Sequence, residues 1–294
     1  MEHVFVGGAT GYLGRFIVQA LLERGLRVTA LARSEAAAGE LRAWGAEVCI
    51  AQATEAGSLA GSMGGVDTVI SALGITRQRD GLTYDDVDFG ANRNLLAEAE
   101  AAGVSRFAYV SVLGGPELLG VEMVRAKERF VELLQGRADE GAIAALIVRP
   151  SGFFSDMRDI LAMAGGGRVW LFGDGGQRLN PIHGADLAAG ILDALDAGEA
   201  SVELGGPEVL TVRQIGELAF AALGTRPRFS SLPMWTVGAA EWVLPRFTPR
   251  HVYGPAQLFL AASRMPMVGA CVGVHHLADF FAEEVQRAPE LRAL

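Results

Sequence analysis

Three glycines, Gly8, Gly11 and Gly14, follow one another at three-residue spacing near the start of the chain. The apolar run 4–6 before them is typical of a strand buried on both faces, and an amphipathic run begins after them at Arg15. A glycine turn between such a strand and a helix lets the backbone approach a pyrophosphate, which rests at the positive end of the helix. The stretch therefore predicts a dinucleotide-binding loop, and a turn that binds nothing is the alternative.

Lys127 is the second candidate for chemistry, because it is the one lysine among the 25 basic residues of the chain. Arginine replaces lysine easily on a solvated surface, but poorly where a compact ammonium group with an adjustable pKa is needed. A chain that uses arginine at all its other basic positions therefore indicates a specific role for Lys127. An exposed lysine on a helix is the alternative interpretation.

Arg33 and Ser34 stand at the end of the apolar run 27–32. At this place, about twenty residues after the glycine loop, an NAD-binding protein usually carries an acidic residue that binds the ribose hydroxyls. A guanidinium group beside a hydroxyl group instead suits a 2′-phosphate. We therefore expect NADP rather than NAD, with a solvated arginine at a strand end as the alternative.

Apolar runs alternate with amphipathic ones through the first half of the chain, which predicts a parallel sheet with helices between its strands. We expect strands at 4–6, 27–32, 47–51, 67–72, 106–111 and 144–148. The expected fold class is α/β, a Rossmann-type doubly wound parallel sheet with a smaller C-terminal substrate lobe. We expect a dinucleotide-binding core at 1–155. A substrate lobe with an apolar C-terminal tail is expected at 156–294, interleaved with the core as one structural unit.

The seven residues from Gly8 to Gly14, Gly-Ala-Thr-Gly-Tyr-Leu-Gly, resemble the glycine motif of the short-chain dehydrogenase/reductase superfamily. They are most similar to its atypical, NmrA-like branch. That branch includes isoflavone-reductase-like enzymes, divinyl chlorophyllide reductases and the nucleotide-binding subunit of respiratory complex I. The resemblance extends with decreasing specificity to about residue 215.

The resemblance implies which residues hold the cofactor. At the pyrophosphate, the family pattern places Gly8, Thr10, Gly11, Tyr12, Leu13 and Gly14. At the ribose and the nicotinamide, it places Ala72, Leu73, Gly74, Ser111, Lys127, Pro150, Ser151 and Phe153. Ser151 stands where the family carries glycine. The polar segment 75–81 is expected to form a loop beside this site, with a plain surface loop as the alternative.

Ser111 and Lys127 match two positions of the superfamily's catalytic set, and Met123 stands where its tyrosine is expected. Four-residue spacing on a helix would place a tyrosine on the same face as the lysine, which would lower the pKa of the phenol. Without that phenol, carbonyl reduction by a tyrosine–lysine pair is not supported. Lys127 can still bind the nicotinamide ribose or act as an acid. His183 is our second candidate for the proton donor, with a structural histidine as the alternative.

The composition argues against several classes of protein. A net charge of −9 argues against a nucleic-acid-binding surface and against attraction to an anionic membrane. No stretch reaches about 18 uninterrupted apolar residues, so we expect no transmembrane segment. Cys49 and Cys271 are too few for a disulfide framework or a metal cluster, and a strand directly at the N-terminus leaves no room for a signal peptide. These features predict a cytoplasmic protein without a metal site.

The leading hypothesis is an NADP-dependent reductase that transfers hydride to a hydrophobic conjugated carbonyl, a quinone or a flavin-like small molecule. Such an acceptor tolerates the loss of the tyrosine, because solvent or Lys127 can protonate the anion that hydride addition generates. The alternative is a non-catalytic NAD(P)-binding redox sensor or assembly factor, which Met123 favours. A sugar-nucleotide epimerase or dehydratase is disfavoured by the missing tyrosine. The apolar tail from Arg226 is expected to cover the substrate cleft, or to form a homodimer or partner-protein surface.

Overall fold

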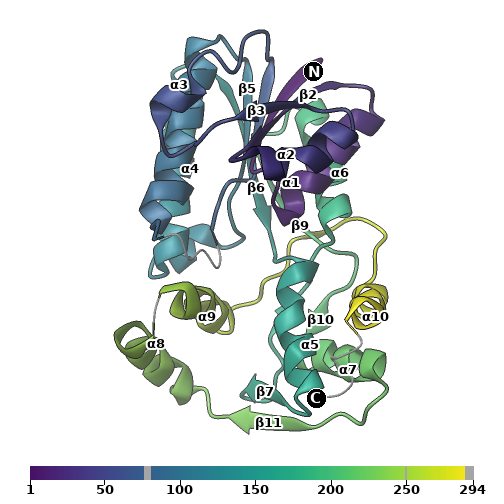
Figure 1. Ribbon diagram of the computed structural model, residues 1–294. Helices are drawn as coiled ribbons and strands as arrows, with labels where there is room; N and C mark the ends of the chain where they lie inside the picture. The colour runs from purple at the N-terminus through teal and green to yellow at the C-terminus, as the bar shows by residue number, and fades with distance from the viewer. Residues whose placement is uncertain (76–80, 249, 289–294) are drawn as a thin grey trace. The chain divides into compact units, whose positions relative to one another are not determined.

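The computed structural model describes residues 1–75, 81–248 and 250–288 (Figure 1). The chain divides into two compact units. The first unit comprises Met1–Arg149 and Leu187–Val202, and the second comprises Pro150–Asp186 and Glu203–Leu294. The predicted division of the chain at residue 155 stays a prediction.

Strands and helices alternate along the first unit as the sequence predicts. In chain order they are β1 (His3–Gly7), α1 (Tyr12–Glu23), β2 (Arg27–Ala32), α2 (Glu35–Ala43), β3 (Glu47–Ile50), the 3₁₀ helix η1 (Ala56–Leu59), β4 (Thr68–Ser71), the π-helix η2 (Asp85–Ala91), α3 (Asn92–Ala101), β5 (Arg106–Val110), the 3₁₀ helix η3 (Gly115–Leu118), α4 (Glu122–Asp139), β6 (Ala144–Pro150) and α6 (Gly184–Ala197). The helical segment before β5 begins as the π-helix η2 and continues as α3.

The central sheet has eight strands in the order β12-β9-β6-β5-β4-β1-β2-β3, where β9 is Ser201–Gly205 and β12 is Ala270–Cys271. Strand β1 is parallel to both of its neighbours, because Val4 pairs with Val28 of β2 and with Thr68 of β4. The chain order therefore reverses at β1, which is the switch point of a doubly wound sheet. The prediction of a Rossmann-type parallel sheet is confirmed, and the glycine loop follows β1 at the carboxyl edge where such sheets bind ligands.

Helices cover both faces of this sheet (Figure 1). On one face α3 and α4 lie over β5, where the Phe130 ring meets Phe107 at 5.8 Å and Tyr109 at 4.6 Å between ring centroids. On the other face α1 and α6 lie side by side, joined by Arg24, which pairs with Asp193 at 2.7 Å and with Asp196 at 2.8 Å. The ion pairs are exposed and contribute little, so the buried aromatic rings stabilise the unit.

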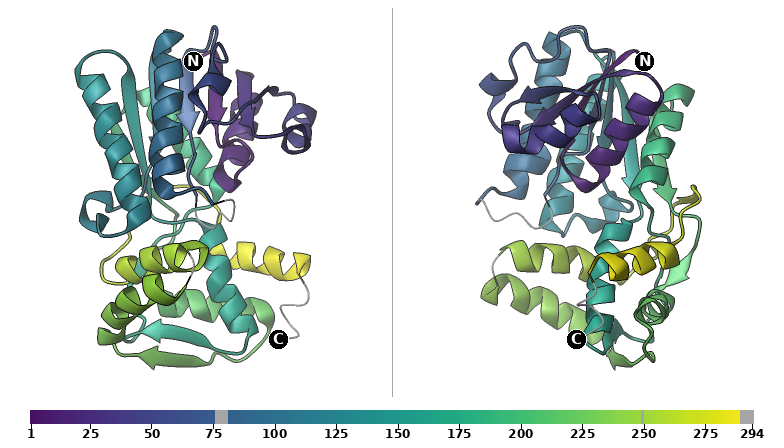
Figure 2. Two further views of the ribbon diagram at one scale, coloured as in Figure 1. Left: turned by 60° about the vertical axis from the view of Figure 1, so that its left-hand side comes forward. Right: turned by 45° about the vertical axis from the view of Figure 1, so that its right-hand side comes forward.

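The second unit is built from short elements. They are the 3₁₀ helix η4 (Phe154–Met157), α5 (Arg158–Gly165), β7 (Val169–Phe172), β8 (Arg178–Leu179), β10 (Leu210–Thr211), α7 (Val212–Leu223), β11 (Phe229–Leu232), α8 (Trp235–Phe247), α9 (Arg250–Ala262) and α10 (Leu277–Arg287). Strands β7 and β11 pair in parallel, and β8 and β10 pair antiparallel. Figure 2 shows α8 and α9 side by side as a helical hairpin. Thr211 and Gln214 form the capping box of α7 that their spacing predicts.

Asn180 holds the loops of the second unit together. Its side chain is fully buried. The amide nitrogen donates to the carbonyl oxygens of Gly206 at 3.1 Å and Gly269 at 3.0 Å, and the amide oxygen accepts from the Gly269 nitrogen at 3.0 Å. One amide therefore satisfies three backbone groups of two distant segments, of which the Gly206 carbonyl is buried and the two Gly269 groups are partly buried, and each of them would lose this partner without it.

We expect Asn180→Ala to lower the free energy of unfolding of the second unit by about 2–4 kcal/mol, because it leaves buried backbone groups unsatisfied. Urea unfolding followed by circular dichroism measures this. Asn94→Ala is the matched control, since Asn94 is half-buried and donates to the Ala53 carbonyl oxygen at 2.9 Å. Equal losses in the two variants would show that Asn180 has no special role.

Candidate functional site

The glycine loop is shaped by close backbone approaches. Gly8 has a φ of +76°, and a Cβ atom there would lie 2.8 Å from the carbonyl oxygen of Ala72. The Gly11 nitrogen donates to the Gly8 oxygen at 2.9 Å, and a Cβ atom on Gly14 would overlap that same oxygen. Gly8 and Gly14 therefore need to be glycine, and the loop is held against the residues that follow β4.

The start of α1 is suited to an anion. Gly11 is its N-cap residue without a side-chain hydrogen bond, and the first turn contains no acidic residue. The first amides of the helix and its dipole therefore favour a negative group at this place. Around it, Tyr12 packs edge-on against Phe16 at 5.4 Å between ring centroids, Leu13 is buried, and the Thr10 carbonyl accepts from Arg15 Nε. The predicted pyrophosphate residues are thus gathered in one turn.

Lys127 lies beneath the loop that follows β4. Its Nζ atom lies 3.1 Å from Oδ1 of Asp88 and donates to the Val110 carbonyl oxygen at 3.3 Å. The Lys127 side chain is only 11% exposed, and the Asp88 side chain is fully buried. A Cβ atom on Gly74 would lie 2.8 Å from both Nζ and Oδ1, so this glycine lets the chain pass directly over the pair. Lys127 is therefore a buried, positioned ammonium group rather than a surface lysine.

The π-helix η2 positions Asp88. Its widened turn leaves backbone carbonyls for outside donors. Asn92 Nδ2 donates to the backbone carbonyl oxygen of Asp88 at 3.0 Å and to that of Val87 at 3.3 Å. The Tyr109 hydroxyl donates to the same backbone carbonyl oxygen of Asp88 at 3.3 Å. Burial raises the pKa of the Asp88 carboxyl group, while Lys127 opposes that rise. Short π-helical segments are frequent at functional sites, and this one keeps a carboxylate beside Lys127.

Tyr109 does not replace the missing catalytic tyrosine. Its ring is fully buried, and burial raises the pKa of its phenol well above the ordinary value. Met123 is also buried in α4, so an apolar side chain occupies the expected tyrosine position. The site therefore contains Lys127 without a phenol four residues before it.

Ser111 is engaged with a charged pair. Its hydroxyl donates to Oε1 of Glu128 at 2.7 Å, and Arg149 pairs with the same carboxylate at 2.7 and 2.8 Å. The side chains of Glu128 and Arg149 are each 11% exposed. The Ser111 proton therefore points to Glu128, which sequence reasoning missed. An acidic residue directly after the one lysine, and an arginine near the end of an apolar strand, were the available signals.

The predicted 2′-phosphate residues lie at the end of β2. Arg33 is exposed, and the Ser34 hydroxyl accepts from the Ala37 nitrogen at 3.4 Å as the N-cap of α2. The serine is therefore used in part by its own helix. Of the predicted polar loop at 75–81, residues 76–80 lie outside the described part of the chain.

Pro150 is the last residue of β6, Ser151 and Phe153 lie in the turn after it, and all three belong to the second unit. The Ser151 hydroxyl donates to the Asn180 carbonyl oxygen at 2.5 Å, and its backbone nitrogen donates to Leu204 at 3.0 Å. The Phe153 nitrogen donates to the Asp156 carboxylate at 3.1 Å. The hydroxyl of Ser151 therefore serves the fold of this turn.

His183 lies in a cluster of imidazoles and carboxylates in the second unit. Its ring stacks on His275 at 4.2 Å between centroids, and its Nδ1 accepts from the Ala185 nitrogen at 3.3 Å. Asp186 holds His275 Nδ1 at 2.8 Å. Burial lowers the pKa of His183, and His275 lowers it further, against the opposing carboxylates of Asp186 and Glu283. A neutral imidazole can donate a hydrogen bond from Nε2 but is a weak acid, so Lys127 is the better proton source.

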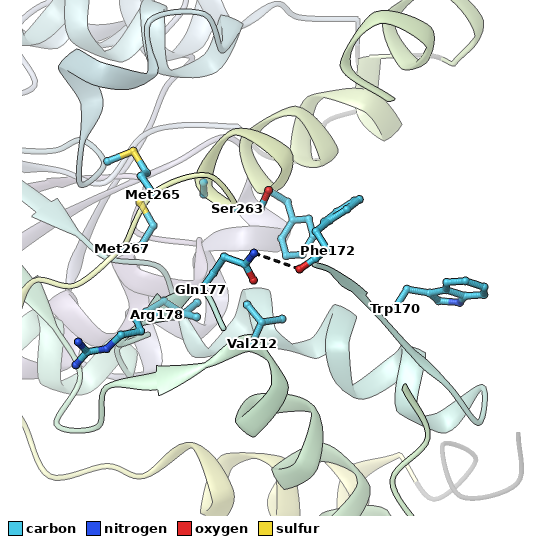
Figure 3. A pocket seen from close by; sticks show the side chains of 11 residues that line it. Trp170, Phe172, Gln177, Arg178, Val212, Ser263, Met265 and Met267 are labelled. Atoms are coloured by element: carbon cyan, nitrogen blue, oxygen red, sulfur yellow. Dashed lines mark hydrogen bonds between the residues drawn. The ribbon is translucent and has the colours of Figure 1, made fainter. Parts of the chain in front are cut away.

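The second unit also contains a small apolar pocket of about 50 Å³ (Figure 3). Its lining comes from β7, from β8 and the residue before it, from the first residue of α7, and from the end of α9 with the segment that follows it. The lining residues are Trp170, Phe172, Gln177, Arg178, Leu179, Val212, Phe259, Ala262, Ser263, Met265 and Met267. In Figure 3 Gln177 points to the Phe172 backbone, where its amide donates to the carbonyl oxygen at 3.2 Å. The pocket suits an uncharged apolar group.

The profile of a family described as NAD(P)H-binding matches residues 8–197 of the chain. The chain belongs to this NAD(P)H-binding family. The match begins at the first glycine of the loop and ends with α6. Membership supports the prediction of a nicotinamide cofactor at the glycine loop.

The proteins similar to this chain include a reductase and a subunit of a larger assembly. The divinyl chlorophyllide a 8-vinyl-reductase of Oryza sativa subsp. indica, a chloroplastic protein, is 34% identical over 260 residues, which is 82% of this chain and 64% of that protein. The chain thus spans less than two thirds of the rice protein. The mitochondrial NADH dehydrogenase [ubiquinone] 1 alpha subcomplex subunit 9 of Arabidopsis thaliana is 28% identical over 243 residues. These residues are 78% of this chain and 60% of that protein. The cytoplasmic location of this chain stays a prediction.

The fold is shared with solved structures. An NADPH-dependent quinone oxidoreductase of Escherichia coli, complexed with NADPH, superposes with a TM-score of 0.72 at 21% identity, over 97% of this chain and 99% of that one. Within the described residues, no three His, Cys, Asp or Glu side chains gather as a metal site would require. Nor does any helix in the described ranges combine the length and the apolar character needed to cross a bilayer.

Folding lowers the pKa of the His183 imidazole. The neutral imidazole therefore contributes its full stability at a pH above its ordinary pKa, and this contribution is lost as the pH falls through the folded pKa. We expect NMR titration to show one imidazole that protonates below pH 6.5, and that signal to disappear in His183→Gln. His276→Gln is the control, since His276 is 53% exposed. A His183 signal that titrates above the ordinary value would contradict the assignment.

Proposed function

We propose that the chain is an NADPH-dependent reductase that transfers hydride to a hydrophobic, conjugated acceptor. The observation that carries the proposal is the buried pair of Lys127 and Asp88 under Gly74, with Met123 in the tyrosine position. The residues of the first unit fit the cofactor, because the glycine loop leaves no room for a side chain and the start of α1 is uncapped and without acidic residues. When bound, NADPH supplies the hydride.

Lys127 would act on the proton rather than on the hydride. Its Nζ atom lies 3.1 Å from the Asp88 carboxyl group, and the Val110 carbonyl oxygen accepts from it at 3.3 Å, so the position of Nζ is fixed. After hydride addition, the electron pair displaced along a conjugated acceptor becomes an anion, which Nζ or solvent protonates. A conjugated acceptor spreads that charge over several atoms. The reaction therefore depends less on a strong acid at one fixed atom than reduction of an isolated carbonyl does.

The names of two similar proteins fit this acceptor class. One is a divinyl chlorophyllide a 8-vinyl-reductase and the other a quinone oxidoreductase. An 8-vinyl group on a chlorophyllide and a quinone are both conjugated and largely apolar. The pocket in the second unit has the matching character, because aromatic, aliphatic and methionine side chains form most of its lining. We infer that the substrate of this chain belongs to the same broad class.

We expect the purified protein to prefer NADPH and NADP over NADH and NAD, because Arg33 can pair with a 2′-phosphate. Arg33→Ala should weaken NADPH binding by about 10- to 100-fold, the value of a charge-assisted hydrogen bond, and leave NADH binding unchanged. Titration by nicotinamide fluorescence measures this. Arg42→Ala is the control, since Arg42 is an exposed arginine on α2 that pairs with Glu35. Equal losses of affinity for NADPH and NADH in Arg33→Ala would show that Arg33 does not bind the 2′-phosphate.

We expect NADPH oxidation with at least one member of a panel of enones, quinones, flavins and vinyl-substituted porphyrins. Lys127→Met should lower kcat by about 10²- to 10³-fold, as loss of a general acid does. Lys127→Arg should recover NADPH affinity more than kcat, because it keeps the charge without an adjustable pKa. Absence of turnover with every acceptor, despite tight NADPH binding, would contradict the proposed activity.

A non-catalytic role is the second candidate. The observations that favour it are the engagement of Ser111 by Glu128 and the apolar Met123 in the tyrosine position. One similar protein is named as a subunit of NADH dehydrogenase, so a partner protein is consistent with the family. In this case NADPH and NADP would bind with similar affinity and no acceptor would be reduced. The acceptor panel therefore distinguishes the two candidates.

A further inference from the structure

Helix α8 presents its apolar residues to solvent. Trp235, Trp242 and Phe247 are 74%, 60% and 75% exposed. Trp235 and Trp242 are seven residues apart, so they lie on one face of the helix, while Val237 on the opposite face is fully buried. A surface helix of a globular protein normally shows the reverse pattern, with polar residues outside. This face therefore needs an explanation other than the fold of the unit.

The charged residues around this face are mostly basic. The Arg246 guanidinium lies over the Trp242 ring, 4.3 Å from its centroid, and is exposed one turn after Trp242 on the same side of the helix. Glu241 is the one acidic residue of α8, and Arg264 pairs with it at 2.8 Å. The tryptophan side of α8 thus carries Arg246, and the one carboxylate of the helix is paired.

The charge distribution along the chain shows the same bias. Residues 218–278 contain five arginines and one glutamate, a net charge of +4 with histidines neutral. Because the whole chain carries −9, the other residues together carry −13. The overall charge, which argues against an anionic surface as a partner, therefore conceals a basic segment around α8 and α9.

We propose that α8 docks on the surface of an anionic lipid bilayer. The helix would lie in the interface plane, with Trp235 and Trp242 among the acyl chains and the Arg246 side chain reaching to the level of the phosphates. Tryptophan favours this interface, because its ring is apolar and its N–H can stay hydrated. Basic amphipathic helices bind in this way through apolar burial and attraction to anionic lipids.

A second copy of the chain fits the face less well. In a symmetric dimer the same patch meets itself, so Arg246 and its neighbours would face like charges. Anionic phosphates complement these arginines instead. The two occupants therefore differ in charge, which makes them separable by experiment.

The docked face lies next to the apolar pocket. Met234, directly before α8, has its sulfur 3.7 Å from the amide nitrogen of Gln177, which lines the pocket. Phe259 of α9 lines the pocket and is 42% exposed. Figure 3 shows the Trp170 ring extending away from the other labelled side chains. Docking would thus bring an apolar pocket close to the bilayer. The docking itself does not depend on the proposed reaction.

Vesicle flotation of the full chain tests the proposal. We expect it to float with vesicles of phosphatidylcholine and phosphatidylglycerol, and much less with phosphatidylcholine alone. The double variant Trp235→Ser/Trp242→Ser should lower the bound fraction about tenfold, and Arg246→Glu should lower it selectively on the anionic vesicles. Leu119→Ser is the matched control, because Leu119 is an apolar residue of the first unit that is 48% exposed. NADPH binding and circular dichroism of each variant report its fold.

Three results would overturn the proposal. The first is absence of binding to the anionic vesicles by the folded wild-type chain. The second is equal loss of binding in the double variant and in Leu119→Ser. The third is a concentration-dependent dimer, measured by analytical ultracentrifugation, that the double variant abolishes, since it would assign the face to a second copy. Because flotation requires no turnover, each of these results is independent of the proposed activity.

Discussion

The approach of backbone to backbone at the carboxyl edge of the sheet is the constraint on which the site depends. Gly8 meets the carbonyl of Ala72 where a Cβ atom would not fit, so the loops after β1 and β4 touch. Gly74, two residues later, passes over Lys127 and Asp88 with equally little room. Because these glycines carry no side chain, the loop after β1, the loop after β4 and the pair of Lys127 and Asp88 come close together, and larger residues would hold them apart.

One turn of α4 connects the ends of three strands. Lys127 turns toward Asp88 and the residues after β4, and it also binds the last carbonyl of β5 at Val110. Glu128 is the next residue and lies about 100° further around the helix, so it turns to Ser111 and to Arg149 of β6. Both charged pairs are nearly buried, where a missing partner would be costly. The position of Lys127 is therefore fixed from two sides.

Local patterns predicted much of this molecule. The strand at 27–32, the capping box at Thr211 and the wound parallel sheet all follow from residues close together in the chain. The glycine loop was also predicted from neighbouring residues. Partners far apart could not be found in this way: Glu128 meets Arg149, and Asn180 reaches Gly269. The π-helix depends on donors from outside it, and the apolar outer face of α8 contradicts the pattern that sequence rules assume.

The missing phenol connects the proposed chemistry to the apolar surface. Without a tyrosine at position 123, and with the Ser111 proton directed to Glu128, the site has one positioned ammonium group to meet developing negative charge. An acceptor suits such a site when it disperses that charge itself, which requires an extended conjugated system. Extended conjugated molecules are largely apolar, so they partition out of water into pockets and bilayers. An enzyme for such a substrate gains by meeting it at a membrane surface, and the exposed tryptophans of α8 beside an apolar pocket would place it there.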